Sequence, residues 1–281
     1  MTAMSAAPSE IPSFGQLLRS TRGARRLSQL QLAVEADVSQ RHLSFLESGR
    51  AQPSREMVLA LSRALDLPLR DRNRLLVSAG FAGIYPARAL SAEDMRPVRA
   101  ALELLLAHHE PYPAIVVDRA WNLFMANAVV PTVFGAIGDL DEMFQRVCGG
   151  GPPNVLKLLL HSDGLQPSIR NFDEVALPLL ARTAREAIEH PHVQDVLDEV
   201  LQYPTVPARW RSLDLHRNVH PLPVLPTEFA VGDRRLDLFS MMTTFGTPLD
   251  VTTDELRVES FFPAAAESEA LLHALAGARS A

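Results

Sequence analysis

The sequence has 281 residues, of which 47% are hydrophobic and 21% are charged, and its formal net charge is -6. This length predicts two domains, and the lack of a long apolar run excludes a membrane-spanning protein. The first residues lack the basic start and hydrophobic block of a signal peptide, and the single cysteine, Cys148, cannot form an internal disulfide, so the sequence predicts a cytoplasmic protein.

Charge is distributed unevenly along the chain. Residues 1–85 contain 11 arginines and 7 acidic residues, a net charge of +4, whereas the remainder contains 16 basic and 26 acidic residues, a net charge of -10. A basic amino-terminal part joined to an acidic remainder is typical of a protein that contacts nucleic acid with one end only. The sequence therefore predicts that any nucleic-acid contact lies in the amino-terminal part.

The first helix is predicted to begin after Ser13, following a disordered arm at residues 1–12. Ser13 and Gln16 have the spacing of a capping box, in which each side chain binds the other residue's backbone amide. Phe14 and Leu18 then give this helix an apolar face. A helical domain is therefore expected from residue 13 onward.

The next stretch predicts two short helices joined by a tight turn. Ser28 and Gln31 have the spacing of a second capping box. Leu30 and Ala33 lie three residues apart, which predicts that both face inward. Asp37 occupies the turn, where aspartate tolerates the left-handed backbone conformation better than most residues.

The second of these helices is predicted to begin after Ser39 and to end at Gly49. Serine is a favoured capping residue, glycine suits a left-handed C-terminal cap, and Leu43 and Leu46 are predicted to face inward. This leaves four polar side chains on the outer side, namely Gln40, Arg41, His42 and Ser44. In the major groove of DNA, arginine pairs with guanine, glutamine pairs with adenine, and serine can serve either base. The outer side therefore has the chemistry needed to read base edges.

Residues Leu18–Leu65 resemble the repressor-type helix-turn-helix of the xenobiotic-response-element (XRE) family. In that family an arginine of the first helix pairs with a glutamate near the end of the reading helix, which implies a structural pair of Arg22 and Glu47. Phosphate contacts, which set register without reading sequence, are expected from Gln29 at a helix N-terminus and from Arg50. The predicted DNA-binding residues are Gln29, Ser39, Gln40, Arg41, His42, Ser44 and Arg50. The alternative is a small helical bundle that binds only protein.

Two further helices are predicted to complete this domain, one from Ser54 to about Leu65 and one from Pro68 to near Gly80. Glycine and proline then interrupt the helical pattern in Phe81–Leu90. The predicted organisation is a disordered arm at 1–12, an XRE-type helix-turn-helix domain at 13–82, a linker and connecting helix at 83–112, and a ligand-binding and dimerisation domain at 113–281. The connecting helix is expected to be capped by Ser91.

The remainder of the chain alternates between strand-like and helix-like segments. Strands are predicted at Ala114–Asp118, Trp121–Ala126, Glu228–Val231, Arg235–Thr244 and Glu255–Phe262. Helices are predicted after Asn127 and at Asn154–His161, Phe172–Glu189, Val193–Gln202 and Ala264–Ala276, with a loop at Cys148–Pro153. This order predicts one antiparallel sheet with helices on one face. The predicted fold class is therefore multidomain, with an all-α five-helix domain followed by an α+β domain.

The second half resembles the ligand-binding domain of MmyB-like regulators, a PAS-like sensor domain. The resemblance covers about Pro113–Leu275 and rests on Asn127, Asn154-Val155-Leu156, Trp210 and His220-Pro221. The chain departs from that pattern at Leu222–Pro226 and at Phe262-Pro263-Ala264. The resemblance implies a fatty-acid-like or similarly hydrophobic effector and no further cofactor.

The apolar residues of this domain have two interpretations. Methionine and aromatic side chains on a curved sheet that faces a helical insert suit an apolar ligand pocket. The same residues suit the packed core of a dimerisation domain. The predicted pocket residues are Val116, Trp121, Met125, Phe134, Phe144, Leu158, Trp210, Phe239 and Met241, with Phe245 as a further candidate.

No catalytic or metal site is predicted. His190 and His192 flank a proline and lack the i, i+4 helical spacing of zinc proteases, and no cysteine pair supports zinc, so this pair is interpreted as a surface or capping feature. Gly149–Gly151 lacks the Lys-Ser/Thr ending of a phosphate loop, and no serine lies in a nucleophile elbow.

The sequence thus predicts a non-enzymatic transcriptional regulator that binds double-stranded operator DNA as a homodimer and senses a hydrophobic small molecule, without contact to a membrane. One alternative is a protein-interaction adaptor that has a helix-turn-helix and no ligand. The other is an enzyme that carries a DNA-binding appendage.

Overall fold

The computed structural model describes residues 12–212, 224 and 226–278. His220-Pro221, most of Leu222–Pro226 and all but the last residue of the predicted arm lie outside the described residues. The chain forms two compact units. The first runs to Ala87 and includes Leu249–Val251, and the second consists of Arg88–Pro248 and the residues from Thr252 onward.

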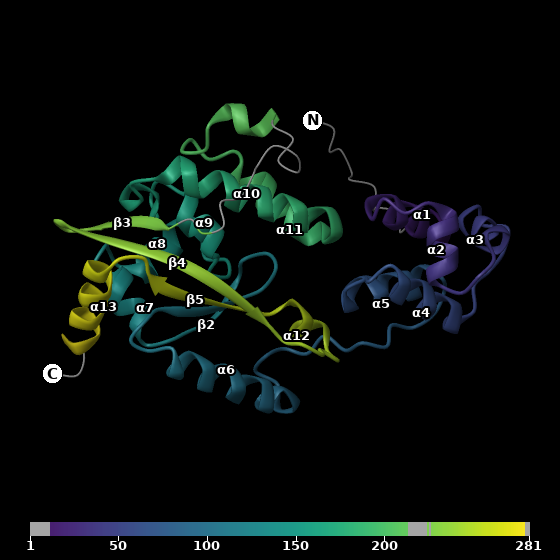
Figure 1. Ribbon diagram of the computed structural model, residues 1–281, viewed down its shortest axis with the longest axis horizontal. Coiled ribbons are helices and arrows are strands. Elements are labelled where there is room, and N and C mark those ends of the chain that lie inside the picture. The colour runs from purple at the N-terminus through teal and green to yellow at the C-terminus, as the bar shows by residue number, and fades with distance from the viewer. Residues whose placement is uncertain (1–11, 213–223, 225, 279–281) are drawn as a thin grey trace, which may run out of the picture. The chain divides into compact units, whose positions relative to one another are not determined.

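In its described residues the first unit consists of five helices, as predicted (Figure 1). They are α1 (Phe14–Ala24), α2 (Gln29–Glu35), α3 (Gln40–Glu47), α4 (Arg55–Ala64) and α5 (Leu69–Ser78). The capping boxes at Ser13 and Ser28 are both present, which satisfies backbone amides that a helix start leaves without a helical partner. Its core is rich in leucine, and Leu18, Leu43 and Leu46 are all 0% exposed.

The turn that joins α2 to α3 has the predicted left-handed residue. Asp37 has φ +55°, and Gly49, which follows α3, has φ +72°. The prediction that Leu30 faces inward is wrong, because its side chain is 57% exposed. The helix α2 has only seven residues, too few for periodicity to fix its orientation, and it buries Leu32 and Ala33 instead.

A glycine in α1 sets how closely the first helix approaches α3. A Cβ atom on Gly15 would lie 2.6 Å from the Leu46 carbonyl oxygen and 2.7 Å from that of Glu47. Both distances are far below van der Waals contact, so a side chain here would separate the two helices. Gly15 therefore helps to position α3, which carries the predicted base-reading residues.

The second unit is built on a five-stranded antiparallel sheet, which confirms the α+β prediction. The strands are β1 (Ala114–Val117), β2 (Leu123–Ala126), β3 (Thr227–Val231), β4 (Arg234–Thr244) and β5 (Arg257–Pro263), in the spatial order β2-β1-β5-β4-β3. The central strands β1 and β5 pair in register, with Ile115 opposite Glu259. This sheet brings the two strands before the helical insert beside the three strands after it.

Eight α-helices pack on or beside this sheet in the described part of the unit. They are α6 (Arg96–His108), α7 (Val129–Gly135), α8 (Leu140–Cys148), α9 (Val155–Leu160), α10 (Phe172–Glu189), α11 (Pro191–Val200), α12 (Val251–Glu255) and α13 (Ala266–Ala278). The prediction of helices on one face only is wrong. Figure 1 shows α6 on the opposite side of the sheet from α9, α10 and α11.

The two faces of β1 belong to two different cores. Ala114 and Val116 pack with α6, whereas Ile115 and Val117 join the large core below the helical insert. Successive side chains of a strand point to opposite faces, so a strand buried on both sides is apolar throughout. This is why the sequence did not reveal the second helical layer.

Three local predictions in this unit need correction, and one helix was missed. Ser91 does not cap α6, which begins at Arg96 after a short 3₁₀ turn and has Pro97 in its first turn. Trp121 lies in the turn before β2 with φ +67°, not in a strand. The start of the predicted strand at Glu255 is the last residue of α12. The helix α8 was not predicted at all.

Candidate functional site: a recognition helix and an apolar cavity

The outer side of α3 is polar and accessible. Ser39 caps the helix, and its Oγ accepts a hydrogen bond from the His42 backbone amide at 3.1 Å. Gln40 and Arg41 are exposed, as is Arg50 beyond the end of the helix, and His42 and Ser44 are half-buried. The Arg41 guanidinium lies over the Phe45 ring, 5.4 Å from its centre. The six α3-side candidates are therefore placed on or beside one accessible surface.

An ion pair holds α3 against α1, as the sequence predicted. The Arg22 Nε donates to Glu47 Oε1 at 2.6 Å and its Nη2 donates to Glu47 Oε2 at 3.1 Å, while Nη1 donates to the Leu27 carbonyl at 2.6 Å. The hydrogen bond to Glu47 raises the pKa of Arg22. Burial opposes ionisation of Glu47, yet hydrogen bonds from Arg22 and Gln29 hold the pKa of this carboxyl below its usual value.

Gln29, which was predicted to contact a DNA phosphate, makes a contact within the protein. Its Nε2 donates to Glu47 Oε2 at 2.8 Å, so Gln29 and Arg22 bind the same carboxylate. The side chain is half-buried at the N-terminus of α2. A phosphate contact through Gln29 stays a prediction.

The second unit contains a cavity of about 840 Å³ between the sheet and the helical insert. This volume lies within the range of small-molecule sites, which is roughly 300–1,000 Å³. Most of its lining is apolar. Four of the predicted pocket residues line it, namely Trp121, Phe134, Phe144 and Leu158.

The other predicted pocket residues lie elsewhere. Val116, Met125 and Phe245 pack with α6 on the opposite face of the sheet, and Trp210 is buried in the core away from the cavity lining. On β4, Leu238 and Ser240 face the cavity, so the alternation of side chains turns Phe239 and Met241 away from it. Phe239 stacks on Phe262 with ring centres 5.4 Å apart, and Met241 is 60% exposed.

Seven polar side chains interrupt the apolar wall, and the sequence did not single them out, namely Asp139, Asp141, Arg182, Arg185, Thr227, Ser240 and Glu259. The Arg182 guanidinium of α10 lies over the Trp121 ring, 5.6 Å from its centre, and burial lowers the pKa of Arg182. Ser240 Oγ donates to Glu259 Oε1 at 2.6 Å, and Glu259 is only 8% exposed. Burial raises the pKa of Glu259. Glu259 is one of two charged residues of β5, and no sequence signal distinguished it.

Two comparisons with known families correspond to the two units. Residues 98–275 match the MmyB-like transcription regulator ligand binding domain, which is more than half of the chain. The chain belongs to the MmyB-like transcription regulators. Residues 13–75 of this regulator match a helix-turn-helix domain. A search of curated proteins found no match.

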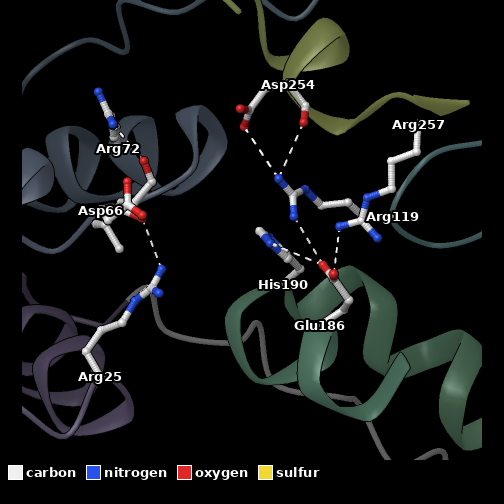
Figure 2. Close-up of polar contacts among 9 residues, drawn as sticks. Arg25, Asp66, Arg72, Arg119, Glu186, His190, Asp254 and Arg257 are labelled. Atoms are coloured by element: carbon white, nitrogen blue, oxygen red, sulfur yellow. Dashed lines mark hydrogen bonds and ion pairs between the residues drawn. The ribbon is translucent and has the colours of Figure 1, made fainter. Parts of the chain in front are cut away.

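The regulator also contains a buried ionic cluster near one end of α10 (Figure 2). Glu186 accepts hydrogen bonds from Arg257 Nη2 at 2.6 Å and from Arg119 Nη1 at 3.1 Å. Arg119 Nη2 lies 4.0 Å from Asp254 Oδ2, and His190 Nε2 lies 3.9 Å from Glu186 Oε2. The cluster therefore connects α10 to the β1–β2 turn, to α12 and to the start of β5.

His190 was interpreted as a surface or capping residue, and it occupies a capping position between α10 and α11 but does not lie on the surface. It is 1% exposed at the junction of α10 and α11, and burial lowers its pKa to about 4. His192, two residues later, is exposed. The buried imidazole is therefore neutral near neutral pH.

Two other kinds of site are absent from the described residues. None of their helices has both the length and the apolar composition that crossing a membrane requires. No three His, Cys, Asp or Glu side chains among them are grouped to hold a metal ion.

Proposed function

We propose that this regulator binds operator DNA sequence-specifically through α3, as XRE-type proteins do, and that its second unit forms a homodimer and senses a hydrophobic, fatty-acid-like effector. The observation that carries the proposal is the accessible polar side of α3. Its inner side is fixed by two fully buried leucines and by the Arg22–Glu47 ion pair. A helix held in this way can present side chains to the major groove without losing much conformational freedom on binding.

The exposed residues have distinct proposed roles. Gln40, Arg41 and Ser44 read base edges, because they occupy the first turns of the accessible side of α3. Ser39, His42, Arg50 and Gln29 contact the sugar-phosphate backbone or the edge of the site and set the register of the helix. The protein is proposed to act in the cytoplasm, which suits the unpaired Cys148.

The proposed regulation depends on dimer geometry. Two recognition helices must lie roughly 34–36 Å apart to enter successive major-groove faces. An effector changes DNA affinity only if it binds better to one spacing than to the other. The cavity of about 840 Å³ supports this proposal, since its apolar lining suits the hydrocarbon part of such an effector.

Salt dependence tests the DNA-binding part. The affinity of the full-length protein for a selected duplex should fall linearly on a double-logarithmic plot as salt rises, because phosphate contacts release counterions. Native mass spectrometry of the full-length protein should show a dimer. DNA binding that does not depend on salt, or a monomer at all concentrations, would contradict the proposed DNA binding as a dimer. Either result would favour the alternative of a protein-interaction adaptor.

Ligand binding in the cavity, and its loss when a larger side chain blocks the cavity, test the effector proposal. Dodecanoic acid should raise the unfolding temperature of the full-length protein, because a ligand that binds only the folded state stabilises it. Ala126→Trp should abolish the rise, since Ala126 lines the cavity from an accessible position on β2. Phe124→Trp is the matched control, because Phe124 lies on the same strand but does not line the cavity. No rise in the unmodified protein, or the same rise in both variants, would overturn the effector proposal.

A further inference from the structure

We propose that the cavity selects amphipathic acids whose head group also carries a hydrogen-bond donor, such as a hydroxyl group beside the acid, and that Arg182 and Glu259 make this selection. Arg182 would bind the acidic group and Glu259 would accept the hydrogen bond from the donor. This inference rests on the proposed effector-binding function and names the class of ligand.

Arg182 lies in the cavity wall and forms no ion pair with another described residue. It lies on α10, and its recorded contact is with the Trp121 ring, which holds the guanidinium in place by a cation–π interaction. No hydrogen bond or ion pair is recorded for Arg182 among the described residues. Arg257 and Arg119, in contrast, both bind Glu186. A guanidinium has five N–H donors arranged to match a carboxylate, so Arg182 can bind an acidic ligand.

Glu259 presents an acceptor to the same cavity. Its Oε1 accepts a hydrogen bond from Ser240 at 2.6 Å, which fixes the orientation of the carboxyl group. No second hydrogen bond to Glu259 is recorded among the described residues, although a carboxylate offers about four acceptor positions. Both Glu259 and Ser240 line the cavity. A ligand that brings a hydroxyl or amide N–H would therefore complete the hydrogen bonding of this group.

The two charged groups are near each other but do not form an ion pair. Each influences the pKa of the other through its charge, yet no Arg182 nitrogen lies within 4.0 Å of a Glu259 oxygen. Arg182 lies over Trp121 and Glu259 accepts a hydrogen bond from Ser240, so each group has its own separate contact. A head group between them would meet a donor on one side and an acceptor on the other.

A simple fatty acid satisfies only half of this arrangement. Its carboxylate would bind Arg182 but would bring no hydrogen-bond donor to the carboxyl group of Glu259. An acid with an adjacent hydroxyl satisfies both residues, and its hydrocarbon chain would contact apolar residues such as Phe134, Phe144 and Leu158. Hydrogen bonds to charged groups are among the stronger ones in proteins, which makes the extra contact sufficient for selection.

Competitive binding with three twelve-carbon probes tests the inference on the full-length protein. The probes are dodecanoic acid, 2-hydroxydodecanoic acid and dodecane-1,2-diol, each titrated against a fluorescent fatty-acid reporter. In the unmodified protein 2-hydroxydodecanoic acid should bind about tenfold more tightly than dodecanoic acid, since one hydrogen bond to a charged group is worth about that factor.

Single variants assign the selection to the two residues. Glu259→Gln removes the charge while keeping the shape, so it should reduce the tenfold preference to about twofold or less. Arg182→Gln should weaken both acids about tenfold and leave the diol unchanged. Arg146→Gln and Glu267→Gln, at exposed positions outside the cavity, are the matched controls and should change nothing. If Arg182→Gln fails to fold, Arg182→Lys keeps the charge but loses the forked geometry and should still weaken the acids.

The outcomes separate the inference from the function on which it rests. Equal affinity of the unmodified protein for the two acids overturns the inference and leaves effector binding intact. A preference that survives Glu259→Gln also overturns it. Failure of all three probes to displace the reporter, or failure of the reporter to bind, overturns the proposed effector binding and the inference together.

Discussion

The two units differ in whether their buried charged side chains form ion pairs. In the helix-turn-helix unit the buried charges are paired, as in Arg22 with Glu47, and the polar side of α3 faces outward. In the second unit one buried cluster around Glu186 is paired, whereas Arg182 and Glu259 stay apart inside the cavity wall. A charge that is paired braces the fold, and a charge that is held in place without an ion-pair partner is available to a ligand.

Removing the ion pair that holds α3 against α1 should have the largest effect, which is a loss of stability. Arg22→Ala leaves the carboxylate of Glu47, whose side chain is 4% exposed, without its charge partner. Breaking a buried pair by deleting one member costs about 3–5 kcal/mol, so the helix-turn-helix unit should lose most of its stability in urea denaturation. Arg63→Ala, at an exposed position of α4, is the control. An equal midpoint for both variants would show that the ion pair does not hold α3.

Changing the outward side of α3 should affect specificity and not folding. Arg41→Ala should weaken binding to the selected operator by about 1–3 kcal/mol and relax the preference at one base pair, because a bidentate contact to guanine is lost. Arg50→Ala should weaken specific and random DNA alike and reduce the salt dependence. Equal loss on both DNAs in Arg41→Ala would remove this residue from the base-reading set.

The buried His190 should make the second unit sensitive to acid. Its folded pKa is lowered to about 4, so the unfolded chain binds more protons between that value and the usual value of about 6.5. The stabilisation is therefore present above about pH 6.5 and is lost as the pH falls toward 4, by up to about 1.4 kcal/mol per pH unit. Thermal unfolding at several pH values measures this slope. His190→Gln should flatten it, and His192→Gln, at the exposed neighbour, should retain it.

The smallest effects are expected at residues that lie outside the cavity although the sequence placed them in it. Met241→Ser should change the affinity for dodecanoic acid by less than about 0.5 kcal/mol, because this side chain is on the outer face of β4. Phe144→Ala should weaken the same ligand clearly, since Phe144 lines the cavity. A loss at Met241 as large as that at Phe144 would contradict the assignment of the two faces.

Local patterns made the helix-turn-helix predictable from the sequence. Capping boxes marked the starts of α1 and α2, Asp37 marked the turn, and an amphipathic helix with one buried side left Gln40 and Arg41 outward. The orientation of the seven-residue α2 was not predictable in the same way. Leu30 lies two residues before Leu32, which is about 200° around the helix, so the burial of Leu32 turns Leu30 outward.

The cavity was less predictable, because its wall is assembled from distant segments. Val116 and Ile115 are adjacent in an apolar strand, and only the packing of α6 on one face decides which of them reaches the cavity. Arg182 and Glu259 lie on α10 and β5, and no sequence spacing relates an arginine on a helix to a glutamate on a strand that follows it by such a distance. Their proximity is a property of the fold.

Selection of bound sequences from random DNA tests the central claim most directly. It should be performed with the full-length protein and with a double variant in which Gln40→Ala and Arg41→Ala are combined, both exposed changes that leave the core untouched. The unmodified protein should enrich one sequence motif, and the double variant should bind DNA without enriching it. Enrichment of the same motif by both proteins, or of none by the unmodified protein, would contradict the claim that the outer side of α3 reads DNA bases.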